Sequence, residues 1–102
     1  MNWKEIRDKY PKAAEAHKKW TKGYYNINVE PDNRDLYDFF DENGIFIRVD
    51  FEFNEDGLEW AYYINRPNFR KTYVGDYYKS RKEAETEAFT KAFEILESKL
   101  KG

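Results

Sequence analysis

The sequence predicts an α+β fold, with a helical N-terminus, a three-stranded antiparallel meander and a C-terminal helix packed on one face of the sheet. Residues 45–64 alternate apolar and polar side chains around a turn, and residues 84–100 carry apolar side chains every four positions. The 102 residues suffice for one hydrophobic core. We therefore expect a single domain over residues 1–102, with residues 24–30 as a candidate fourth strand.

The element that organises the chain is a hairpin over residues 45–64. Apolar side chains occupy alternate positions from Ile45 to Phe53, and again from Leu58 to Ile64. This alternation is typical of strands with one buried face, because successive side chains point to opposite faces. The Asp56-Gly57 pair between the two runs is a strong turn signal.

The length of the hairpin loop decides which residues face each other. A two-residue loop of Asp56-Gly57 sets Phe53 opposite Trp60, whereas a four-residue loop sets Phe53 opposite Leu58 and Glu52 opposite Glu59. Like charges directly opposite each other are destabilising, so we predict the two-residue loop. A three-residue loop would pair apolar with charged residues. We expect Trp60 in the core, where Trp60→Ala would destabilise the fold by about 3–5 kcal/mol.

The N-terminal part is predicted to be helical. Asn2 and Glu5 form a capping-box pattern, and apolar side chains follow at helical spacing. Pro11 either kinks this helix or opens a second one as its first residue. The next apolar stripe runs to Trp20, and Gly23 is the predicted stop.

The segment before the hairpin contains one further helix. Residues 24–30 fit either a short edge strand or an extended connection. Asp32 or Asn33 then caps a short helix over residues 34–42, which Asn43-Gly44 ends.

Two elements follow the hairpin. Residues 69–78 are predicted as a third strand broken by Gly75, and neither alternating set of its side chains is clearly apolar. Ser80 and Glu83 form a second capping box, which predicts the start of the C-terminal helix. Along that helix an apolar stripe recurs every four residues, at Ala84, Ala88, Ala92, Leu96 and Leu100, with Phe89 and Phe93 beside it.

Composition excludes several classes of protein. Without cysteine the chain forms no disulfide, zinc-thiolate site or catalytic thiol. No apolar run is long enough to span a membrane and the start lacks a signal-peptide pattern, so we expect a cytoplasmic protein without membrane contact.

The net charge of −2 conceals an uneven distribution. Residues 1–23 carry seven Lys or Arg against three acids, residues 24–65 carry two against eleven, and residues 66–102 carry nine against six. We expect these charges to complement one another mainly within the fold; the alternative is a bipolar surface for a partner.

No pattern predicts catalysis or a cofactor. His17, the single histidine, lies among alanines without a nucleophile or acid beside it, which favours a packing role. Glu52, Asn54 and Asp56 fit the alternate spacing of a calcium loop, but Tyr63 stands where its bidentate glutamate is required. The glycines are isolated, so no phosphate-binding loop is present. The sequence predicts a non-enzymatic protein with no metal and no cofactor.

Basic side chains beside aromatic ones make nucleic-acid binding the alternative function. Three antiparallel strands followed by a helix opening Ser80-Arg81-Lys82-Glu83-Ala84-Glu85 resemble the second half of a double-stranded-RNA-binding domain. The last helix of that family begins with a Lys-Lys-x-x-Lys-type cluster that contacts phosphates. Arg81 and Lys82 match its first two basic positions, whereas Glu85 stands at the third and the loop over 54–57 is acidic. The resemblance makes RNA binding a minority hypothesis, with candidate residues Arg66, Arg70, Lys71, Lys79, Arg81 and Lys82.

A second resemblance covers more of the chain. Residues 10–13, 36–45 and 80–85 with 88–97 are similar to segments of small uncharacterised bacterial proteins, some of them carried by phages or mobile elements. No activity is attached to that family. The resemblance therefore implies only a small, intracellular, non-enzymatic protein.

The outward face of the predicted sheet favours protein binding. If the apolar set of the hairpin faces the helix, Phe46, Arg48 and Tyr63 share the opposite face, with Tyr73 or Tyr77 as candidate neighbours. Contiguous aromatic and arginine surface is characteristic of protein interfaces. The competing interpretation, of about equal weight, is that the N-terminal helices cover this face. We predict a protein–protein interaction module that binds another protein through Phe46, Arg48 and Tyr63.

Overall fold

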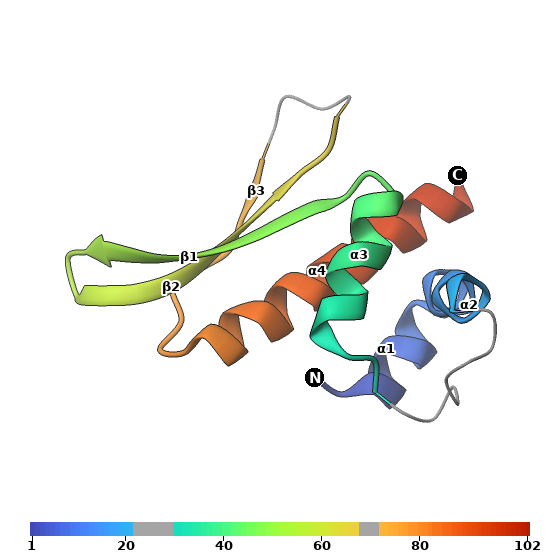
Figure 1. Ribbon diagram of the computed structural model, residues 1–102, viewed down its shortest axis with the longest axis horizontal. Helices are drawn as coiled ribbons and strands as arrows, with labels where there is room; N and C mark the ends of the chain where they lie inside the picture. The colour runs from blue at the N-terminus through green and yellow to red at the C-terminus, as the bar shows by residue number, and fades with distance from the viewer. Residues whose placement is uncertain (22–29, 68–71) are drawn as a thin grey trace.

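The computed structural model describes residues 1–21, 30–67 and 72–102, and its elements follow the predicted order (Figure 1). Within these residues the α+β class is confirmed, with a three-stranded antiparallel sheet and a C-terminal helix packed against it. The candidate strand over 24–30 lies outside the described residues, apart from Glu30. The elements are α1 Trp3–Lys9, α2 Pro11–Trp20, α3 Asn33–Glu42, β1 Phe46–Asn54, β2 Gly57–Asn65, β3 Tyr73–Val74 and α4 Arg81–Lys101.

Capping side chains begin three of the helices at the predicted places. Asn2 begins α1, Asp32 begins α3 and Ser80 begins α4, each by accepting a backbone N–H from the first turn. Pro11 is the first residue of α2, so it opens a second helix rather than kinking the first. No side chain caps α2 from the preceding residue, Tyr10.

The helices form a layer on one side of the sheet (Figure 1). α4 runs across β1 and β2, α3 packs against β1, α2 packs on α4, and α1 packs on α2. The largest fully buried side chains lie between these elements, and four of them are phenylalanines. They are Phe39, Phe40, Phe89, Phe93, Leu36, Ile45, Ile64 and Leu96.

The hairpin register differs from the predicted one. Phe53 faces Leu58, so the predicted pairing of Phe53 with Trp60 is wrong. The ladder continues to the pair of Asn54 and Gly57, and Gly57 adopts a φ of 109°, a conformation that favours glycine. The two registers differ by two residues, so the apolar residues stay on the predicted face.

The two glutamates that argued against this register do face each other, and each has a partner of its own. Glu52 faces Glu59 across β1 and β2. The Tyr63 hydroxyl donates to Glu52, and Lys79 Nζ lies 2.8 Å from Glu59 Oε1. These contacts offset the repulsion. Tyr63 belongs to the hairpin itself, whereas Lys79 lies between β3 and α4.

The third strand is interrupted at Gly75, as predicted. Tyr73–Val74 pairs with β2, and the ladder resumes where Tyr78 pairs with Trp60, which leaves one extra residue in the third strand. This is a β-bulge. A Cβ on Gly75 would lie 2.0 Å from the Tyr62 ring, so the ring packs directly against the glycine. Residues 69–71 of the predicted strand lie outside the described residues.

The hairpin extends beyond the helix layer, and its tip is exposed (Figure 1). Phe51, Phe53 and Leu58 belong to the helix-facing side, yet they are 53%, 82% and 58% exposed. Trp60 is half-buried; its ring stacks on Phe51 with centroids 4.8 Å apart, and the Arg81 guanidinium lies 4.6 Å from its centroid. The expectation that Trp60 is a core residue is therefore wrong.

Candidate protein-binding surface

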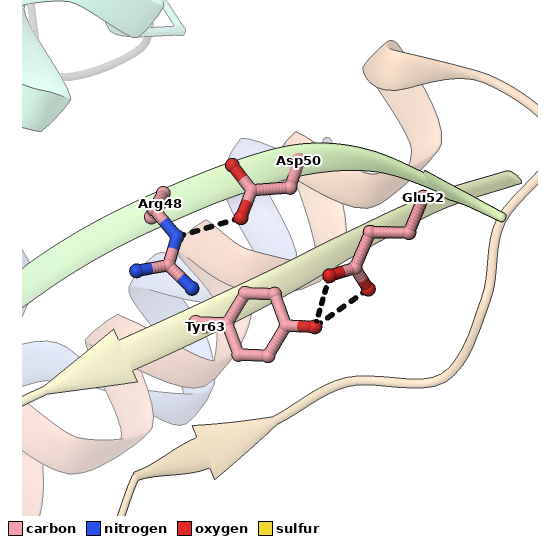
Figure 2. A network of polar contacts seen from close by, with 4 residues as sticks. All are labelled: Arg48, Asp50, Glu52 and Tyr63. Atoms are coloured by element: carbon pink, nitrogen blue, oxygen red, sulfur yellow. Dashed lines mark hydrogen bonds and ion pairs between the residues drawn. The ribbon is translucent and has the colours of Figure 1, made fainter.

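The face of the sheet opposite the helices carries the predicted protein-binding residues. The alternation of β1 and β2 sets Phe46, Arg48 and Tyr63 on this outer face, where Arg48 and Tyr63 are direct cross-strand partners. Figure 2 views this face, and the helices lie behind the sheet. Within the described residues, the alternative that the N-terminal helices cover this face is not observed, because α1 packs on α2 and α2 packs on α4.

Arg48 is held at the surface by two contacts. Its Nε donates to Asp50 at 2.7 Å, and its guanidinium carbon lies 4.5 Å from the centroid of the Tyr63 ring (Figure 2). The Arg48 side chain nevertheless remains 59% exposed. Stacking on an aromatic ring and pairing with a carboxylate restrict the rotamers of an otherwise flexible side chain.

Tyr63 is fixed by Glu52. Its hydroxyl lies 2.6 Å from both carboxylate oxygens of Glu52 (Figure 2). This hydrogen bond, with a smaller contribution from burial, raises the pKa of Tyr63 to about 12. The phenol therefore stays protonated at neutral pH, and the ring presents a rigid aromatic surface.

Further apolar groups extend this face. Phe46 is 42% exposed, Val74 is 61% exposed and pairs with Tyr63, and Tyr77 is 50% exposed. We call the set Phe46, Arg48, Tyr63, Val74 and Tyr77 the outer-face patch. Its members come from all three strands and from the segment after β3.

The bulge explains which third-strand residues reach the patch. Tyr73 and Tyr78 both pack against the core. Tyr77 lies four residues after Tyr73, so in a strand without a bulge its side chain would point to the same, inner face as that of Tyr73. The extra residue at the bulge reverses the alternation, so Tyr77 faces outward. The strand pattern alone makes Tyr73 and Tyr77 equal candidates and gives no signal for Val74, because the bulge is not visible in it.

Among the candidate nucleic-acid-binding residues that the structure describes, Arg66 lies apart from Lys79, Arg81 and Lys82. Lys79 is paired with Glu59, Arg81 stacks on Trp60, and Lys82 is exposed in the first turn of α4. The acidic hairpin tip lies at this same end of the sheet (Figure 1). Arg70 and Lys71 lie outside the described residues.

Arg66 lies at the opposite end of the sheet, beside a cleft of about 570 Å³ between the α3–β1 turn and the last turns of α4. Its guanidinium carbon is 5.0 Å from the centroid of the Tyr73 ring, and Lys91 Nζ lies at the same distance from that centroid. Phosphate binding gains affinity when several cations act on one backbone, and this arrangement separates Arg66 from the basic residues at the start of α4.

His17 lies in an aromatic environment inside the helix layer. Its ring centroid is 5.0 Å from that of Phe39, and the rings of Trp3 and Trp20 lie 5.9 Å away. Burial lowers the pKa of His17, against a smaller opposing effect of Asp35. The predicted packing role of His17 agrees with these contacts.

Residues 1–21, 30–67 and 72–102 contain no group of three or more His, Cys, Asp or Glu side chains placed to hold a metal ion. In the same residues, no helix is both long enough and apolar enough to cross a membrane.

Comparison of the chain with protein-family models, with curated proteins and with solved structures gave no match. The two resemblances noted in the sequence therefore remain expectations.

Proposed function

We propose that this chain is a protein-binding module that recognises a partner protein through the outer-face patch. The observation that carries the proposal is the arrangement of Arg48 and Tyr63. Arg48 is exposed and Tyr63 is half-buried on the outer face of the sheet, and each is fixed by a carboxylate of the same face. Tyrosine and arginine are enriched among the residues that dominate binding energy at protein interfaces.

Preorganisation supports the same function. Binding through flexible side chains loses conformational entropy for each side chain that becomes ordered. Asp50 and Glu52 already restrict Arg48 and Tyr63 in the unbound chain. A partner that contacts these two residues therefore orders few additional groups.

The patch also indicates the chemistry of the partner. Phe46, Val74 and Tyr77 present apolar surface around the Arg48–Tyr63 pair, on a sheet face that is otherwise polar. A complementary surface would bring apolar side chains to these three residues and an oxygen acceptor to the guanidinium of Arg48. Nucleic-acid binding receives less support, because Lys79 and Arg81 are engaged within the chain.

The test compares two phenylalanines of the same strand that lie on opposite faces. Immobilised wild-type chain, Phe46→Ala, Tyr63→Ala and Phe53→Ala are used to capture proteins from a cell extract, and each captured protein is then purified and titrated by calorimetry. We expect Phe46→Ala and Tyr63→Ala to weaken binding at least about tenfold, the scale of an interface hot spot. Phe53→Ala, which truncates the more exposed ring on the other face, should bind like the wild type.

Circular dichroism and thermal unfolding are measured for each variant to check that it is folded. Equal binding by the wild type and by Phe46→Ala and Tyr63→Ala would contradict the proposal, as would loss of binding in Phe53→Ala alone. An NMR titration of the labelled chain with duplex RNA at low salt tests the alternative function. Changes in amide chemical shift at Arg66 and at residues 79–82 that become smaller as the salt concentration rises would favour nucleic-acid binding instead.

A further inference from the structure

β1 forms one edge of the sheet and carries neither of two common protections of an edge. The strand order is β1-β2-β3, and among the described residues only β2 forms backbone hydrogen bonds with β1. β1 is nine residues long and contains neither proline nor a bulge. The opposite edge, β3, has two residues and is followed by the bulge. Short and bulged edge strands resist pairing with other chains, whereas a long regular edge is a template for it.

The backbone contacts of β2 show which groups of β1 face the open edge. Trp60 exchanges both backbone hydrogen bonds with Tyr78, at 2.8 and 2.7 Å, so Trp60 directs its N–H and C=O toward the third strand. Its neighbour Ala61 must direct these groups toward β1, where it faces Asp50. The residues of β1 that alternate with Asp50 therefore point their N–H and C=O to the open edge. These residues are Ile47, Val49, Phe51 and Phe53.

We infer that this edge of β1 pairs, antiparallel and about a two-fold axis, with β1 of a second copy of the chain. With the axis at Val49, each Val49 faces its equivalent and each Arg48 faces Asp50 of the second copy. A two-fold axis produces this opposite-charge pair twice. Moving the axis by one residue in either direction sets Arg48 against Arg48, or Asp50 against Asp50, which is repulsive.

The apolar side of the strand fits the same register. With the axis at Val49, Ile47 of one copy faces Phe51 of the other on the side of the helix layer. Phe51 stacks on Trp60 in the single chain and is still 53% exposed, so pairing covers part of the exposed ring with a second apolar neighbour. The outer-face patches of the two copies then lie on one continuous sheet.

This inference extends the proposed function by naming a second copy as one partner. Self-association and partner binding can fail separately, because self-association uses the edge of β1 and is measured on the purified chain alone. An interface of one strand from each copy lies at the small end of the range for protein complexes, so we expect a dimer in the micromolar range.

The experiment is a charge exchange at Arg48 and Asp50, read by sedimentation velocity from about 5 µM to about 500 µM. Arg48→Asp leaves two acidic residues at these positions, and Asp50→Arg leaves two basic ones. We expect each single variant to lower self-association at least tenfold, an equimolar mixture of the two to form a heterodimer, and the double variant Arg48→Asp/Asp50→Arg to dimerise like the wild type. Lys4→Asp is the control, because it makes the same charge change on an exposed residue of α1.

Amide hydrogen exchange identifies the surface that pairs. Raising the concentration should protect the amides of Ile47, Val49 and Phe51 and leave that of Asp50 unchanged, because Asp50 already faces β2. The inference is overturned if the wild type stays monomeric at the highest concentration. It is also overturned if a dimer forms that the single variants do not weaken, or whose new protection lies outside β1.

Discussion

Glu97 links the last helix to the start of α2, and its removal tests how the helix layer is held together. The side chain is buried, and its Oε1 accepts the backbone N–H of Ala13 at 2.8 Å. Because α2 begins with Pro11 and has no side-chain cap from Tyr10, this carboxylate takes the place of a local N-cap. The carboxylate also lies at the positive end of the α2 dipole.

The magnitude follows from what each substitution leaves behind. Glu97→Ala removes a charge-assisted hydrogen bond and leaves a buried N–H without its acceptor, so we expect it to lower the free energy of unfolding by about 2–3 kcal/mol. Glu97→Gln keeps an oxygen acceptor but loses the charge and its contact with Lys101 Nζ, 3.6 Å from Oε2, so a loss of about 1 kcal/mol is expected. For a domain of this size, the alanine variant should lower the Tm by roughly 10–20 °C.

The assay is urea unfolding followed by tryptophan fluorescence, with Glu94→Ala as the matched control. Glu94 is on the same helix, and its side chain is 50% exposed with only an exposed contact to Lys91. Glu94→Ala should therefore change stability by less than about 0.5 kcal/mol. If Glu97→Ala and Glu94→Ala lose the same small amount, the tertiary cap does not stabilise α2 and the reasoning fails.

Three further predictions concern other parts of the fold. Gly75→Ala should destabilise by about 1–3 kcal/mol in urea unfolding, because its Cβ would overlap the Tyr62 ring; an unchanged midpoint would mean that the ring moves aside without loss. Burial lowers the pKa of His17, so the unfolded chain binds a proton first as the pH falls below about 6.5, and stability should decrease from about pH 7.5 to about pH 5. His17→Phe should reduce that pH dependence, and an identical slope would exclude His17 as its source. Trp60→Ala should cost about 1–2 kcal/mol, less than the 3–5 kcal/mol expected for the fully buried Phe93→Ala, and an equal loss would place Trp60 in the core after all.

The elements and their inner faces follow from local sequence. Capping residues such as Asn2 and Ser80 begin their helices because their side chains reach N–H groups only three residues away. The alternation in the hairpin assigns Arg48 and Tyr63 to the same face in both the predicted and the observed register, because the two registers differ by two residues and such a shift preserves the face. The predicted protein-binding residues were therefore placed together by periodicity alone.

The tertiary structure decided the features that depend on distant partners. The observed hairpin register sets Glu59 opposite Glu52, and Glu59 is paired with Lys79, which lies twenty residues further along the chain. The position at which α4 crosses the sheet leaves Trp60 half-buried, and the bulge at Gly75 turns Tyr77 outward. Periodicity specifies the direction of a side chain but not what lies opposite it. The partners of Glu59 and Glu97, and the exposure of the hairpin tip, are set by packing between segments that local patterns do not relate.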